Sequence, residues 1–188
     1  KANILRRFQL YGQLMLDDFN FSMARTGPNY FGNKIGYQAG LKWVNVFGLR
    51  MVDLQLEYNR IRPYTYAHYN IASNYSHYGN PLAHPRGSNI NEAIGILRIR
   101  PHARLGIEAL AGYTQQGLDP TDRSRNFGGN IFRSDNTRNN GTSDVRFNNT
   151  VGQGNAWTLM RASVRITYQI LRLDAFVDLE AHYRQETY

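Results

Sequence analysis

The chain has 188 residues, a formal net charge of +8, a mean hydropathy of −0.55 and no cysteine. This composition excludes a disulfide framework and thiolate metal sites, and no apolar run is long enough to predict a transmembrane helix. The basic residues, mostly arginine, are spread over every segment, and the absence of a basic cluster argues against a nucleic-acid interface.

Alternation of apolar and polar residues predicts a series of β-strands, because successive side chains of a strand point to opposite faces. The predicted strands, in chain order, cover about residues 4–16, 33–47, 49–61, 90–100, 103–117, 155–169 and 172–184. The run at 49–61 alternates most clearly, and the run at 90–100 is less regular. Aromatic residues tend to end the apolar faces, as at Tyr37, Trp43, Tyr58, Tyr113, Tyr168 and Tyr183.

The connections between the predicted strands alternate between long and short. The long ones are residues 17–32, 62–89 and 117–154, and the short ones are Phe47-Gly48, Arg100-Pro101-His102 and Ile170-Leu171. Outer-membrane barrels sort their connections in this way, with long loops outside the cell and short periplasmic turns. The sequence therefore predicts an all-β fold, an antiparallel up-and-down transmembrane β-barrel.

A soluble β-sandwich shows the same alternation with its faces inverted, but the predicted strands, at about 11–15 residues, exceed the usual 5–6. In a barrel the polar faces line the lumen. The predicted lumen charges are Asp53, Glu57, Glu108, Arg161, Arg165, Asp178 and Glu180. Because bacterial barrels have an even number of strands, the odd count predicts that residues 1–188 are part of one larger barrel domain and lack at least one strand at the C-terminus.

The loop at 62–89 is rich in tyrosine and histidine, residue types that stack on sugar faces and reach hydroxyl groups. Candidate glycan-binding residues are Arg62, Tyr64, Tyr66, His68, Tyr75, His77, His84 and Arg86. The structural alternative is a folded-in loop in which these side chains satisfy one another and the lumen wall. The histidine spacing matches no zinc signature, and no metal site is predicted.

The loop at 117–154 carries several arginines and aspartates, which fit either recognition of an acidic glycan or a solvated, charge-balanced loop. Its acidic residues lack the spacing of a calcium loop. No G-x-S-x-G motif occurs, and Asp178, Glu180 and His182, on one strand face, are interpreted as lumen charges. We therefore predict no catalytic residue and no cofactor.

Several segments resemble the capsule-assembly Wzi-like outer-membrane proteins, in particular the branch with gliding-motility barrels of the RemB type. The segments are LYGQLMLDDF, NKIGYQAGLKW, LQLEYNRIRPYTYAHYN, NYSHYGNPLAHPRGSN and GGNIF, and the similarity covers about residues 10–129. The resemblance implies a large barrel in the bacterial outer membrane, of which residues 1–188 would be the C-terminal part. It also implies a lectin-like role, which is to hold capsule or exopolysaccharide to the cell. It supplies no binding residues.

The expected partners are outer-membrane lipid, a surface polysaccharide and, in a complex, other envelope proteins; nucleic acid is not expected. Two further functions stay open at this point. One is an accessory or scaffold barrel of a secretion or gliding-motility complex, and the other is a diffusion porin, which needs an open lumen.

Overall fold

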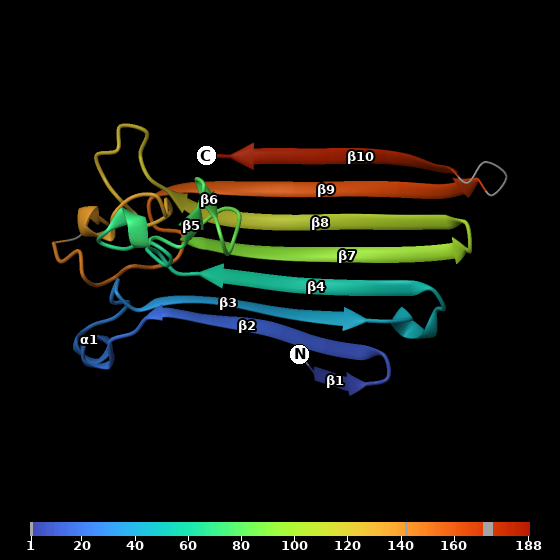
Figure 1. Ribbon diagram of the computed structural model, residues 1–188, viewed down its shortest axis with the longest axis horizontal. Coiled ribbons are helices and arrows are strands. Elements are labelled where there is room, and N and C mark those ends of the chain that lie inside the picture. Colours follow the sequence, from blue (N-terminus) through green and yellow to red (C-terminus); the bar gives the residue numbers. More distant parts are fainter. Residues whose placement is uncertain (1, 142, 171–174) are drawn as a thin grey trace.

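The computed structural model describes residues 2–141, 143–170 and 175–188, which form one large antiparallel sheet with folded loops at one end (Figure 1). Its strands are β1 (Ala2–Leu5), β2 (Phe8–Asp18), β3 (Lys34–Trp43), β4 (Val52–Ile61), β7 (Ile90–His102), β8 (Leu105–Leu118), β9 (Asn155–Ile170) and β10 (Ala175–Thr187). A short hairpin, β5 (Ser76–His77) and β6 (Asn80–Pro81), lies in the loop after β4.

Helical segments are short: α1 (Phe21–Thr26), η1 (Val46–Gly48), η2 (Ile71–Ser73) and η3 (Asp135–Thr137). Within the described ranges, no helix has the length and apolar character that crossing a membrane requires.

The sheet order is β1-β2-β3-β4-β7-β8-β9-β10, with every neighbouring pair antiparallel. Among the described residues β1 and β10 are its two edges, so the sheet is open. The three long connections lie at one end, which we call the long-loop end, and the short connections lie at the other, the turn end (Figure 1). The predicted all-β antiparallel fold is confirmed, and a closed barrel is not found in the described strands.

The register keeps apolar residues on one face across the sheet. Leu41 pairs with Leu10 and Leu56, and Ala109 pairs with Leu97 and Val164. A register shift of one residue would move these side chains to the other face. We call this side the apolar face, and many of its larger side chains are exposed: Leu10, Leu14, Leu56, Met160, Val164, Ile166 and Leu179. The other side is the polar face.

A row of charges crosses the polar face near the turn end. Cross-strand pairing aligns Asp53, Arg98, Glu108, Arg165 and Glu180 on five consecutive strands, so that acidic and basic residues alternate. Arg98 Nε donates to Glu108 Oε2 at 2.7 Å, and Arg165 Nη2 donates to Glu180 Oε2 at 3.0 Å. Opposite charges on directly paired residues favour this register over a shifted one.

Three strand boundaries differ from the prediction. The run at 4–16 is divided by a turn at Arg6-Arg7, because a continuous strand would place Arg6 on the apolar face with Phe8. The turn after β3 is longer than predicted and covers residues 44–51, since Asn45 adopts a left-handed conformation and ends the strand.

The residues of the predicted turn Arg100-Pro101-His102 belong to strand β7, which ends at His102. The strand accommodates Pro101, which has no N–H to donate, because this residue lies at an irregularity of the pairing. Of the predicted short connection Ile170-Leu171, Leu171 lies outside the described residues.

The long loops fold together into a compact body that we call the loop cap, formed by residues 19–33, 62–89 and 119–154. Asn89 connects its parts. Its side-chain amide donates to the carbonyl oxygens of Gly117 at 2.9 Å and Gln153 at 2.8 Å, and its Oδ1 accepts from Gly152 N at 2.7 Å. Asn89 is fully buried and left-handed, with φ of 58°, a conformation that asparagine tolerates well.

Replacement of Asn89 with alanine should destabilise the loop cap, because the buried carbonyl of Gly117 and the half-buried backbone groups of Gly152 and Gln153 would lose their partner. Each orphaned group costs about 1–3 kcal/mol. Urea unfolding and trypsin cleavage within the loops measure the effect. The control is Asn136→Ala, which removes an exposed asparagine of the same cap. Equal stability of the two variants would contradict the role given to Asn89.

Candidate functional site

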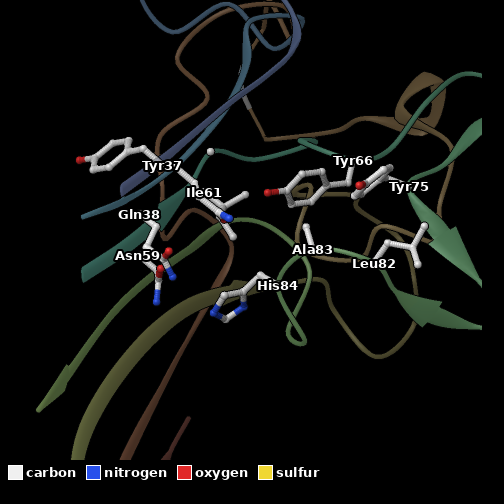
Figure 2. Close-up of a pocket in the computed structure, with 11 residues that line it drawn as sticks. Tyr37, Gln38, Asn59, Ile61, Tyr66, Tyr75, Leu82, Ala83 and His84 are labelled. Atoms are coloured by element: carbon white, nitrogen blue, oxygen red, sulfur yellow. The ribbon is translucent and has the colours of Figure 1, made fainter. Parts of the chain in front are cut away.

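A cavity of about 330 Å³ lies between the polar face and the loop at 62–89. Strands β2, β3 and β4 form its floor, and the loop folds back over it (Figure 2). It is lined by Gln13, Gly36, Tyr37, Gln38, Asn59, Ile61, Tyr66, Tyr75, Leu82, Ala83 and His84. The lining combines aromatic rings with neutral amides and one imidazole, groups that stack on apolar surface and form directional hydrogen bonds.

Tyr66 and Tyr75 form the aromatic wall of the cavity, with ring centroids 5.8 Å apart (Figure 2). The Tyr66 hydroxyl fits over Gly36, where a Cβ would lie only 2.9 Å from that oxygen. Asp17, near the end of β2, accepts a hydrogen bond from the backbone N–H of Tyr66 at 3.2 Å. Burial, followed by the charge of Asp17, raises the pKa of Tyr66, which therefore stays a neutral phenol at physiological pH.

His84 is held against the sheet by Glu92, which lies on the polar face near the start of β7. His84 Nε2 lies 3.1 Å from Glu92 Oε2, and the other oxygen of that carboxylate accepts from Thr114 Oγ1 at 3.0 Å. Arg161 Nη2 lies 3.4 Å from the same oxygen. Glu92 thereby fixes the position of the His84 ring at the edge of the cavity.

A buried ion pair joins the sheet to two loops. Lys34 Nζ lies 2.9 Å from Asp135 Oδ2 and donates to the carbonyl oxygen of Ala67 at 2.6 Å. The Lys34 side chain is only 3% exposed. Because a charge so deeply buried needs its partner, this pair fixes the position of the loops at 62–89 and 119–154 on β3.

Of the residues predicted to bind glycan, three line the cavity: Tyr66, Tyr75 and His84. Tyr75 keeps 42% of its surface exposed. Tyr64 has no exposed surface, and its hydroxyl donates to the carbonyl oxygen of Asn126 at 2.7 Å. Its buried position in the loop cap leaves no side-chain surface for the sugar contact that the sequence suggested.

The remaining candidates lie elsewhere. His77 is on the exposed β5–β6 hairpin, its ring centroid 4.3 Å from that of Tyr78, outside the cavity. His68 Nε2 lies 3.4 Å from Asp17 Oδ1. Arg62 donates to the carbonyl oxygen of Tyr30 at 3.2 Å, and burial lowers its pKa. Arg62 and His68 thus contact neighbouring segments of the fold, and neither they nor His77 line the cavity.

Arg86, the last candidate, lines a second cavity of about 540 Å³ in the loop cap. Its guanidinium lies over the ring of Trp157, 4.7 Å from the centroid, and burial lowers its pKa. Arg123 and Arg133 also line this cavity, but Arg133 is held by Asp119 at 2.6 Å. The basic lining suits a carboxylate or another anionic substituent.

Sequence reasoning missed the amides that form the cavity floor, Gln13, Gln38 and Asn59. The alternation of their strands assigned them to the polar face. The sequence allowed a folded-in loop at 62–89, but no local pattern indicated that it would cover these amides.

The predicted lumen charges all lie on the polar face, as the register shows. Glu57 accepts from the Tyr11 hydroxyl at 2.7 Å, and Asp53 accepts from the backbone N–H of Asn45 at 3.0 Å. Within the described ranges, no group of three or more acidic or histidine side chains is placed to hold a metal ion.

No protein-family model, no curated protein and no solved structure matches this chain.

Replacement of Lys34 with methionine should release the loop cap from the sheet, because Asp135 would remain buried without a cation. Removing one partner of a buried pair costs about 3–5 kcal/mol. Urea unfolding measures this loss, and the double variant with Asp135→Asn should lose less than the sum of the single variants. The control is Lys42→Met, which removes an exposed lysine from the same strand. Additive losses would exclude coupling between Lys34 and Asp135.

Proposed function

We propose that the sheet is the wall of an outer-membrane β-barrel whose loop cap holds a surface polysaccharide. The observation that carries this proposal is the apolar face, which exposes leucine, valine, isoleucine and methionine side chains over the length of the sheet. Water-soluble proteins rarely expose so large an apolar surface. A bilayer covers such a face, while the opposite, charged face lines a lumen.

Aromatic residues at two levels of the apolar face support a membrane position. Tyr37 and Tyr58 lie toward the long-loop end, and Phe8 and Trp43 lie at the turn end, with Phe8 and Trp43 stacked at 5.0 Å. Tyr37 and Trp43 are six residues apart on β3, which is roughly 20 Å of strand. The apolar band of an outer-membrane barrel is about 25 Å tall between its aromatic girdles.

The open edges of the sheet support the proposal that further strands complete the barrel. In the described part of the chain, β10 pairs only with β9. Unpaired backbone groups are too costly to expose to hydrocarbon. Strands of the same polypeptide would close the larger barrel that the sequence predicted. A strand from another protein would make the chain a scaffold component, which is the second candidate function.

The site for the polysaccharide is the cavity beneath the loop at 62–89. Tyr75 provides exposed aromatic surface, backed by the buried ring of Tyr66. Gln13, Gln38 and His84 provide hydrogen-bonding groups for sugar hydroxyls. The second cavity, which contains Arg86 and Arg123, suits an acidic sugar of the same chain. The resemblance of residues 10–129 to capsule-assembly barrels favours this function. A cap folded over the polar face also disfavours an open porin channel.

Replacement of Val164 with arginine should impair insertion of the chain into lipid bilayers. Val164 is in the middle of β9 on the apolar face, and an arginine facing lipid at mid-depth costs about 2–4 kcal/mol. Folding into phosphatidylcholine vesicles, followed by protease protection, measures insertion. The neighbouring control Ser163→Arg places the same charge on the polar face and should insert normally. A soluble sheet would tolerate Val164→Arg without penalty, and that result would exclude the membrane proposal.

Replacement of Tyr75 with alanine should weaken polysaccharide binding about tenfold, which is the loss expected when one stacked aromatic ring is removed. A panel of immobilised neutral and uronic-acid hexasaccharides provides the probes, and biolayer interferometry measures affinity. The control is Tyr78→Ala, since Tyr78 is 91% exposed on the hairpin and lies outside the cavity. Equal affinities of the two variants would exclude the cavity as the site.

A further inference from the structure

The turn end of the sheet carries exposed arginines on each of its described connections. Arg6 and Arg7 form the β1–β2 turn, Arg50 lies between β3 and β4, and Arg100 and Arg104 flank the β7–β8 turn. Residues 44–51 and 100–104 contain no aspartate or glutamate. Within the described ranges, none of these five guanidinium groups forms an ion pair.

Several basic residues at the long-loop end have internal partners instead. Lys34 pairs with Asp135, Arg133 with Asp119 and Arg146 with Asp144. Arg86 and Arg138 lie over the rings of Trp157 and Phe31. The positive charge of the turn end is therefore not needed to hold the described fold together, and it is available to an anion outside the chain.

Large apolar side chains are exposed on the connection that carries Arg50. Phe47 is 82% exposed, and Leu49 and Met51 are more than half exposed. The Phe47 ring packs edge-on against Trp43, with centroids 4.8 Å apart. From the β1–β2 turn, the Arg7 side chain reaches this connection, where a Cβ on Gly48 would lie 3.9 Å from its Nη1. Guanidinium groups and apolar tips thus share one surface, which we call the turn-end surface.

We propose that the turn-end surface binds the headgroups of anionic phospholipids, an inference that rests on the proposed membrane position. Charge complementarity selects the anion, since arginine makes bidentate contacts to phosphate oxygens. The apolar side chains select a lipid over an acidic protein or a free anion, because Trp43 and Phe47 suit the boundary between headgroups and acyl chains. Basic residues close to an anionic bilayer surface contribute additively to this attraction.

Energy transfer from Trp43 to a labelled lipid tests the proposal. The full chain carrying Trp157→Phe, which leaves Trp43 as the only tryptophan, is folded into phosphatidylcholine bilayers. These bilayers contain a small fraction of dansyl-labelled phosphatidylglycerol or, in parallel, dansyl-labelled phosphatidylcholine. We expect the anionic probe to be enriched about fivefold near Trp43, which is the enrichment that the attraction of one basic side chain to anionic lipid would produce. Added salt should reduce this enrichment.

The variant R6Q/R50Q/R104Q should lose the enrichment, whereas the control R25Q/R123Q/R125Q, with the same change of charge on exposed residues of the long loops, should keep it. Equal transfer to both probes in the inserted protein, or enrichment that survives in R6Q/R50Q/R104Q, would overturn the lipid site and leave the membrane proposal standing. Protease protection reports insertion separately. A chain that does not insert would overturn both proposals.

Discussion

The rest of the structure depends on a cross-strand register that never exchanges its two faces. Leu41 meets Leu10 and Leu56, and the same alternation continues through β9 and β10. Since the side-chain period of a strand is two, one slipped residue would expose charge on the apolar face and bury hydrocarbon among the polar groups. The alternating row of charges from Asp53 to Glu180 opposes such a slip, because a slip would separate each acidic residue from the basic residue with which it pairs.

The two ends of the sheet use polar chemistry differently. At the long-loop end, buried polar groups such as Asn89, and the pair of Lys34 with Asp135, hold the loops in one arrangement. The apolar core there is small, with Ile61, Tyr66, Ile90 and Ile131 at its centre. Hydrogen bonds are directional, so they specify one loop arrangement where a few apolar contacts would allow several. At the turn end, short connections leave arginines and apolar side chains exposed, which creates a surface instead of a folded cap.

Local patterns were sufficient for the strands and for the face on which each residue lies. They failed where a boundary depends on one residue's backbone, as at Asn45, or on pairing with a neighbour, as at Pro101. For the candidate site, residue type pointed to the loop that covers the cavity but not to its orientation. Tyr64, Tyr66 and Tyr75 are chemically equivalent in the sequence, yet one is fully buried and two line the cavity. The difference arises from contacts to residues far along the chain, such as Asn126 and Asp17.

The sequence by itself determined the all-β antiparallel sheet, the division of residues between two faces, and the sorting of long and short connections. These features follow from period-two alternation and chain length, which are local properties. Only the tertiary structure decided how the loop at 62–89 folds onto the polar face, which side chains surround the cavity, and which arginines have partners. Those outcomes depend on hydrogen bonds and ion pairs between distant segments, such as Lys34 with Asp135, and no local pattern encodes the choice of a distant partner.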